Sequence, residues 1–154
     1  MNRTFKFNTL YIGILLLVLA FSSCTSSKQL AIQKNKTAQL SRKLGFTVNR
    51  KDDLPLLEEV SRWLGTPYRY GGTTRTGADC SGFVGAVYKN VYHKSLQRTV
   101  VNIYNKDCQR IGKRRLKPGD LVFFNFSKRK KRTLNHMGIY LKNGYFAHAS
   151  TSKG

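Results

Sequence analysis

The stretch from residue 136 to residue 150 constrains the fold of this chain most, because it has the pattern of a β-hairpin. Two runs rich in apolar side chains, His136–Leu141 and Tyr145–Ser150, lie on either side of Lys142-Asn143-Gly144. An Asn-Gly pair between such runs is a strong hairpin signal, because both residues accept the backbone angles of a tight turn. The sequence therefore predicts two antiparallel strands here.

The length of the turn decides where the two histidines of this hairpin point. With a two-residue loop, Ile139 would pair with His148, and His136 would lie on the opposite face of the sheet. With a three-residue loop, Gly138 would pair with His148, and the histidines would share a face about 7–8 Å apart at their α-carbons. Gly144 suits the left-handed position of that longer loop. We therefore predict the three-residue loop, with one apolar face made of Met137, Ile139, Leu141, Tyr145, Ala147 and Ala149.

Two amphipathic helices are predicted ahead of the strands. The first follows Asp53, which can cap it, and its apolar residues recur at helical spacing, with Glu58 and Glu59 facing outward. The second starts at about Cys80 and has one apolar face. A further strand is predicted over Leu121–Phe126. Because the helices come first and the strands follow, the order predicts an α+β fold with an antiparallel sheet.

Cys80 carries the sharpest chemical signal in the chain, within the pentapeptide Asp79-Cys80-Ser81-Gly82-Phe83. A thiol nucleophile works as the thiolate, and a helix N-terminus lowers a thiol pKa from its ordinary value of about 8.5. Such a thiol also needs a base, and the base needs an orienting group. We expect His136 to be the base and His148 to orient it. The alternative is an inert buried cysteine, with Asp79 serving only as the helix cap.

The N-terminus has the organisation of a secretory signal. Arg3 and Lys6 precede an almost wholly apolar run, Leu10–Phe21, which is shorter than the roughly 20 apolar residues that span a bilayer. Small residues then lead to Cys24, as in a bacterial lipobox, where the cysteine is lipidated. We expect residues 1–24 to be a lipoprotein signal peptide. An ordinary secretory signal and a short core helix are the alternatives.

The rest of the chain is expected to form a tether and one domain. Residues 25–52 are polar and basic and are predicted to be a partly mobile tether, followed by a domain over residues 53–154. The chain has 28 Lys and Arg against 7 Asp and Glu, a formal net charge of +21, which attracts polyanions. No motif supports nucleic acid as that polyanion. We expect a monomer held by its lipid anchor at the outer membrane and facing the periplasm.

Six short motifs follow one another in the second half of the chain. They are Tyr68–Gly72, Asp79–Val84, Leu96–Thr99, Leu116–Phe124, His136–Leu141 and Tyr145–Ser150. In this order they resemble the motifs of the NlpC (p-sixty) family of cell-wall cysteine peptidases. The resemblance implies a papain-like α+β fold, with the nucleophile helix packed on an antiparallel sheet and Cys80, His136 and His148 as a catalytic triad.

The same resemblance implies a substrate. The family hydrolyses peptidoglycan stem peptides, at bonds of the D-Glu–diaminopimelate or diaminopimelate–D-Ala type, without a metal or cofactor. It implies that Tyr68 borders the nucleophile and helps at the oxyanion or the substrate, and that Asp79 and Ser81 hold the substrate. Family domains usually continue with another strand where this chain stops at Gly154. Either the chain is truncated there or that strand is absent, which would leave a sheet edge exposed.

Other functions stay open at this level. An amidase or a transpeptidase on the same fold would use the same triad, and a wall-binding module would bind without cleaving. A zinc site built from the two histidines, Cys80 and Cys108 lacks short-range ligand spacing. We expect Cys108 to be a spare thiol and His93 to lie at the surface. The basic loop at residues 128–132 is either a solvated loop or an attraction for anionic wall polymer.

Overall fold

The computed structural model describes residues 9–126 and 133–151, with side chains from Ser27 onward. The predicted basic loop at residues 128–132 and the side chain of Cys24 lie outside this described part. The chain divides into two compact units, and the division falls between Arg50 and Lys51.

The first unit is dominated by one long helix, α1 (Thr9–Leu44). The predicted tether is therefore helical over much of its length, because Lys, Gln, Ala and Leu are good helix formers. The helix ends at Gly45, whose φ of 75° is the left-handed conformation of a helix C-terminus. No helix in the described ranges is both long and apolar enough to cross a membrane.

The second unit begins with the two predicted amphipathic helices, and both predicted starts are confirmed. In α2 (Leu54–Trp63), the Asp53 carboxylate accepts the Leu56 N–H at 3.1 Å. In α3 (Cys80–Tyr92), the Asp79 carboxylate accepts the Gly82 N–H at 2.7 Å. Each carboxylate satisfies a backbone donor that the first helical turn would otherwise leave without a partner.

Helices α2 and α3 pack against each other through a buried polar contact as well as an apolar one. The rings of Trp63 and Phe83 meet edge to face, with centroids 5.6 Å apart. Glu59 was predicted to face outward, and that prediction is wrong, because its side chain is buried. Its carboxylate accepts hydrogen bonds from the Trp63 indole at 3.1 Å and from the Asn90 amide at 2.8 Å. The bond from Asn90 ties α3 to α2. Burial opposes ionisation of Glu59, but the hydrogen bonds from Asn90, Trp63 and Arg62 keep the pKa of its carboxyl below the ordinary value.

The strands of the described residues form two antiparallel sheets. Strands β1 (Thr73–Thr74) and β2 (Gly77–Ala78) make a short ribbon just before α3. The larger sheet has the order β3-β4-β5, with β3 at Leu121–Phe124, β4 at His136–Lys142 and β5 at Tyr145–Ala147. Between α3 and β3 lie three short helical segments: α4 (Val100–Asn102), the π-helix η1 (Ile103–Asp107) and the 3₁₀ helix η2 (Lys113–Arg115).

The hairpin of β4 and β5 differs from the prediction at its turn. The paired residues are Ile139 with Ala147, Tyr140 with Phe146 and Lys142 with Tyr145. The loop therefore has two residues, Asn143 and Gly144, whose φ angles of 49° and 84° are both positive. The three-residue loop was wrong, because an Asn-Gly pair in this conformation matches the twist of the flanking strands.

A bulge next to the turn nevertheless gives β4 and β5 the residue pairing that the longer loop would have produced. The register shifts between Tyr140 and Lys142, so Leu141 is the extra residue on β4. Beyond the bulge, Ile139 faces Ala147 as predicted. Tyr145 lies on the turn side of the bulge and is 49% exposed, so it does not join the predicted apolar face.

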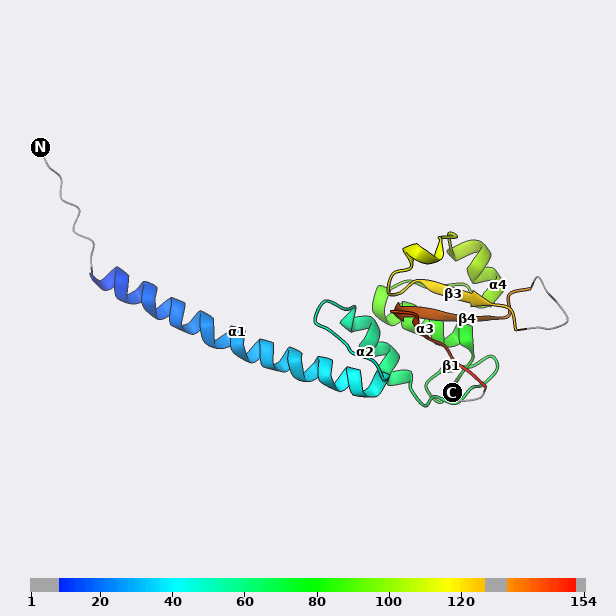
Figure 1. Ribbon diagram of the computed structural model, residues 1–154, viewed down its shortest axis with the longest axis horizontal. Coiled ribbons are helices and arrows are strands. Elements are labelled where there is room, and N and C mark those ends of the chain that lie inside the picture. Colours follow the sequence, from blue (N-terminus) through cyan, green and yellow to red (C-terminus); the bar gives the residue numbers. More distant parts are fainter. Residues whose placement is uncertain (1–8, 127–132, 152–154) are drawn as a thin grey trace, which may run out of the picture. The chain divides into compact units, whose positions relative to one another are not determined.

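Helix α3 lies along β4 and covers the face of the sheet that carries Met137 and Ile139 (Figure 1). The core between them contains fully buried side chains from both elements: Val84, Val87, Met137 and Ile139. The predicted α+β fold with the Cys80 helix packed on an antiparallel sheet is confirmed. This packing brings the N-terminus of α3 to the first residues of β4.

Candidate active site

Cys80 is the first residue of α3, and it is 5% exposed. Burial raises the pKa of its thiol above the ordinary value. A hydrogen bond from the backbone N–H of Met137 on β4 opposes this rise, whereas the Asp79 carboxylate adds to it. The sulfur therefore lies against the residue that directly follows His136.

His136 and His148 meet at one end of the larger sheet. His136 opens β4, and His148 follows the last residue of β5. The Nε2 atom of His136 lies 2.7 Å from the Nδ1 atom of His148, and the two rings are nearly perpendicular, at 89°. Burial lowers the pKa of both imidazoles, and the charge of His148 lowers that of His136 further. Both rings are thus biased toward the neutral form, which can accept a proton.

The close approach of the histidines depends on Gly138. A Cβ built at this position would lie 3.1 Å from the Cβ of His148 and 2.5 Å from the Ala147 carbonyl oxygen. A larger residue at 138 would push β5 away from β4. Gly138, which the sequence predicted to pair with His148, thus lies directly against it.

The structure brings the predicted nucleophile and the predicted base to neighbouring positions without joining them directly. Over residues 9–126 and 133–151, the thiol hydrogen-bonds the Met137 N–H, and no hydrogen bond links Cys80 to either imidazole. Because Nε2 of His136 is engaged by His148, Nδ1 is the ring nitrogen left for the thiol. Catalytic hydrogen bonds are often long before substrate binds.

Three more predicted site residues lie close to Cys80: Tyr68, Asp79 and Ser81. Tyr68 pairs with Ala78 in an isolated β-bridge. Burial raises the pKa of the Tyr68 hydroxyl, and the negative charges of the Cys80 thiolate and of Asp79 raise it further, so the phenol is near both. Asp79 and Ser81 are buried, and the Ser81 hydroxyl donates to the Asp79 carboxylate at 3.1 Å.

Arg98 is a residue of this site that the sequence analysis did not assign. Its guanidinium makes a two-point contact with Asp79, at 2.7 and 3.0 Å, and also donates to Ser81 at 2.8 Å. Burial opposes ionisation of Asp79, but Arg98 and two backbone N–H groups hold the pKa of that carboxyl below its ordinary value. The only sequence signal was its position inside the motif Leu96–Thr99.

Aromatic rings surround the histidine pair on the outer face of the sheet. Phe126 is 65% exposed, and its ring centroid lies 5.1 Å from that of His136. Phe146 lies 5.2 Å from His148 by the same measure. Phe124 stacks on Phe126 at 5.6 Å, with the planes only 6° apart. The imidazoles are therefore held between rings, which limits their rotation.

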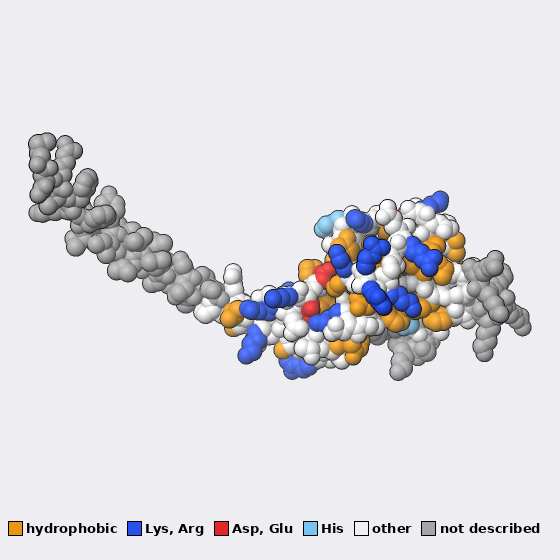
Figure 2. Space-filling view, turned by 45° about the horizontal axis from the view of Figure 1, so that its top comes forward, with side chains coloured by type: hydrophobic (Ala, Val, Ile, Leu, Met, Phe, Trp, Pro, Cys, Tyr) orange, Lys and Arg blue, Asp and Glu red, His pale blue; other side chains and the backbone are white. Residues whose placement is uncertain are grey.

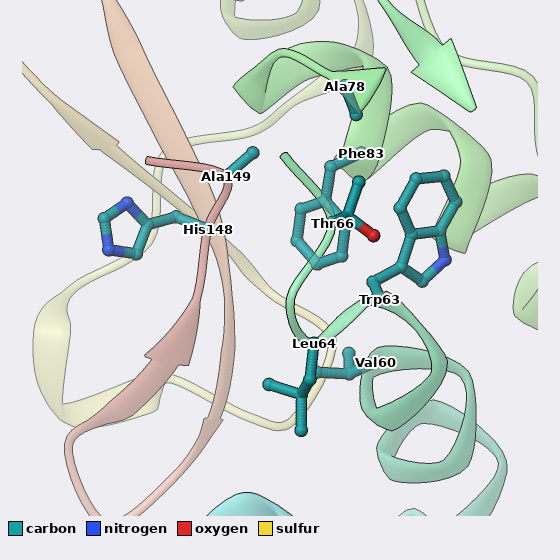
Figure 3. Close-up of a pocket in the computed structure, with 8 residues that line it drawn as sticks. All are labelled: Val60, Trp63, Leu64, Thr66, Ala78, Phe83, His148 and Ala149. Atoms are coloured by element: carbon teal, nitrogen blue, oxygen red, sulfur yellow. The ribbon is translucent and has the colours of Figure 1, made fainter. Parts of the chain in front are cut away.

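An apolar pocket of about 350 Å³, including its open mouth, is lined in part by His148 (Figure 3). The lining residues are Val60, Trp63, Leu64, Thr66, Ala78, Phe83, His148 and Ala149. In this view the imidazole of His148 points away from Phe83 and Trp63. The pocket thus borders the backbone of the His148 segment rather than its ring.

The remaining candidates do not join the site. Cys108 is a half-buried free thiol in the loop after η1, and burial raises its pKa. His93 ends α3 at the surface, in a left-handed conformation with a φ of 55°. Within the described part of the chain, no three His, Cys, Asp or Glu side chains are grouped so that they could hold a metal ion. The zinc alternative therefore has no ligand set in these residues.

Comparison with known proteins identifies the family. The sequence pattern of the NlpC/P60 family matches residues 65–154, which is more than half of the chain. The chain belongs to the NlpC/P60 family. Solved NlpC/P60 domains share its fold at 28% sequence identity. The domain of the peptidoglycan hydrolase SagA superposes with a TM-score of 0.55, over 64% of this chain and 81% of that domain.

Curated relatives of this NlpC/P60 chain include named endopeptidases. It is 46% identical over 99 residues to the probable endopeptidase NlpC of Escherichia coli K12, covering 64% of this chain and 62% of that protein. It is 36% identical over 99 residues to the murein DD-endopeptidase MepS/murein LD-carboxypeptidase of the same strain, covering 50% of that protein. The chain thus spans about half to two thirds of the length of the curated relatives it matches.

Proposed function

We propose that this protein hydrolyses peptide bonds in the stem peptides of peptidoglycan, with Cys80 as nucleophile, His136 as base and His148 as its orienting partner. The observation that carries the proposal is the position of the Cys80 thiol one residue along the chain from a hydrogen-bonded histidine pair. The thiol at the start of α3 touches the Met137 N–H, and the preceding residue, His136, is hydrogen-bonded to His148 at 2.7 Å. The D-Glu–diaminopimelate and diaminopimelate–D-Ala bonds are the proposed targets.

The first half of the reaction forms a thioester. His136 takes the thiol proton at Nδ1, while its Nε2–H donates to His148 Nδ1 and so holds the ring in place. The Cys80 sulfur attacks the scissile carbonyl carbon, and the negative charge moves onto the carbonyl oxygen. The backbone N–H of Cys80 and the Tyr68 hydroxyl are the proposed donors to that oxygen. When the tetrahedral intermediate collapses, His136 returns its proton to the leaving amine.

The second half releases the acyl product. A water molecule gives a proton to neutral His136 and attacks the thioester carbonyl. Collapse of this intermediate expels the Cys80 sulfur, which takes the proton back from His136. One peptide bond and one water are consumed, and one carboxylate and one amine are formed. The lowered pKa of His136 suits both halves, because the ring is neutral when each proton must be accepted.

Two further features support peptidoglycan as the substrate. Relatives that match 64% and 58% of this chain are named murein DD-endopeptidases. The chain also carries a formal net charge of +21, and Lys and Arg side chains spread over the face of the second unit seen in Figure 2, where acidic ones are few. Such a surface attracts the carboxylates of stem peptides and of anionic wall polymers.

We also propose that the protein works in the cell envelope, held by a lipid on Cys24 at the outer membrane. The support is the apolar run Leu10–Phe21 that precedes this cysteine. Labelling cells with a radioactive fatty acid tests it: the intact chain should take up label and a Cys24→Ala variant should not. Equal labelling of both chains would refute the anchor.

Digestion of purified peptidoglycan tests the enzymatic proposal. The intact protein should release soluble fragments that carry new amine ends, and Cys80→Ala should release none. Cys108→Ala is the matched control, because it removes a free thiol outside the site and should leave the release unchanged. Fragment release by Cys80→Ala would exclude Cys80 as nucleophile. New crosslinks in place of new amine ends would mean that the acyl group is transferred rather than hydrolysed.

A further inference from the structure

Arg98 lies beside the nucleophile, in a contact that the mechanism above does not use. One terminal nitrogen, Nη2, donates to Asp79 Oδ2 at 2.7 Å. The other, Nη1, donates to Asp79 Oδ1 at 3.0 Å and to the Ser81 hydroxyl at 2.8 Å. Asp79 and Ser81 are the two neighbours of Cys80 in the chain. A single guanidinium thus holds both residues that flank the thiol.

The carboxylate that Arg98 holds also organises the backbone around the thiol. Besides capping α3 at Gly82, Asp79 accepts the N–H of Gly71 through Oδ2 at 2.9 Å. The turn that contains Gly71 packs closely on the first turn of α3, because a Cβ at Gly82 would lie 2.0 Å from the Gly72 carbonyl oxygen. Asp79 is 7% exposed, and a charge buried to this degree is costly without an opposite charge beside it.

Asp79 and Arg98 together determine the charge next to the Cys80 sulfur. Three charged or titratable side chains interact with the charge of Cys80: Asp79, Arg98, and Tyr68 from the loop after α2. His136, which is hydrogen-bonded to His148, directly precedes Met137, whose N–H contacts the sulfur. The Asp79 carboxylate disfavours a thiolate at Cys80, and the Arg98 cation favours one. Removing Arg98 would leave the unfavourable charge next to the thiol without its partner.

We propose that Arg98 is a positioning residue for the nucleophile, which clamps Asp79 and Ser81 on either side of Cys80 and cancels the carboxylate charge next to the sulfur. This role rests on the proposed function only in that Cys80 is the nucleophile there. The charge effect itself is a property of the folded protein. It can therefore be measured without any turnover.

Alkylation of Cys80 by iodoacetamide, followed across pH in the full chain, tests the proposal. Mass spectrometry of the peptide that contains Cys80 reports its rate, and Cys108 in the same molecule serves as an internal reference. The variants are Arg98→Met, which removes the charge, and Arg98→Lys, which keeps it. Arg62→Met is the matched control, because Arg62 is also a half-exposed arginine paired with a buried carboxylate, that of Glu59 at 2.8 Å.

The pH midpoint of Cys80 alkylation should rise by about one unit in Arg98→Met, as expected when a neighbouring carboxylate loses its counter-charge. It should return toward the original value in the double variant Asp79→Asn/Arg98→Met. Arg98→Lys and Arg62→Met should keep the original midpoint. The proposal is overturned if Arg98→Met leaves the midpoint unchanged, or if Arg98→Lys shifts it as far as Arg98→Met does.

Two features of the design keep the result interpretable. If Arg98→Met does not fold, which circular dichroism would reveal, Arg98→Lys carries the test, and a midpoint shifted by about one unit in that variant overturns the proposal. Failure of the proposed function is seen separately. A protein that releases no peptidoglycan fragments would refute the peptidase assignment, whereas the alkylation profile would still decide the role of Arg98.

Discussion

Replacement of Gly138 by alanine should separate the two histidines without straining the backbone. Gly138 is not among the glycines with a positive φ, so alanine can adopt its conformation. The added Cβ would lie 2.5 Å from the Ala147 carbonyl oxygen, 3.0 Å from Cδ2 of Phe146 and 3.1 Å from Cβ of His148. Ordinary contact begins at 3.4 Å, and the nearest atom belongs to the backbone and cannot rotate away.

The magnitude follows from these distances. Strand β5 would have to move by roughly 0.9 Å to restore contact, and overpacking of this kind costs about 1–3 kcal/mol of folding free energy. His148 moves with the strand, so its hydrogen bond to His136 lengthens from 2.7 Å. A displacement of about 1 Å at a catalytic group can cost about 100-fold in rate, and we expect a fall of that order in kcat.

Urea unfolding and kcat on a soluble stem peptide measure the two effects. The matched control is Gly85→Ala in α3, where an added Cβ meets nothing within 4 Å. Because glycine weakens a helix, this variant should be more stable by about 0.5–1 kcal/mol and keep full activity. The reasoning is refuted if Gly138→Ala retains both the stability and the kcat of the original chain.

Two further predictions follow from the buried groups. The kcat/KM should fall at acid pH with a midpoint below 6.5, because burial and His148 lower the pKa of His136 and only the neutral ring accepts a proton. A midpoint above 6.5 would contradict the assigned environment of that ring. Glu59→Ala should lower the free energy of unfolding in urea by about 1–3 kcal/mol, because the buried Trp63 indole would lose its acceptor. An unchanged urea midpoint would show that this acceptor contributes nothing.

Local chemistry made the helix starts and the histidine pair predictable. Asp53 and Asp79 each precede an apolar face, and a capping carboxylate needs only its own helix. The shared face of His136 and His148 followed from the better apolar set on the opposite face. The loop itself was missed, because a bulge at Leu141 has the same effect on register as a longer turn.

Contacts between distant segments were not predictable in this way. Glu59 was expected in solvent because its partner Asn90 belongs to another helix, 31 residues later. Arg98 reaches Asp79 across 19 residues, and no periodic pattern links the two. The Met137 N–H touches the Cys80 sulfur only because α3 packs along β4. Each of these contacts depends on tertiary packing, which sequence spacing does not encode.

Digestion of peptidoglycan in water enriched with ¹⁸O tests the central claim most directly. Mass spectrometry of the soluble fragments would give the new termini and the isotope content together. The account predicts fragments with a new amine end and one ¹⁸O atom in each new carboxylate, made by the intact chain and not by Cys80→Ala. Fragments without the label, or labelled fragments made equally by Cys80→Ala, would contradict hydrolysis by a Cys80 thioester.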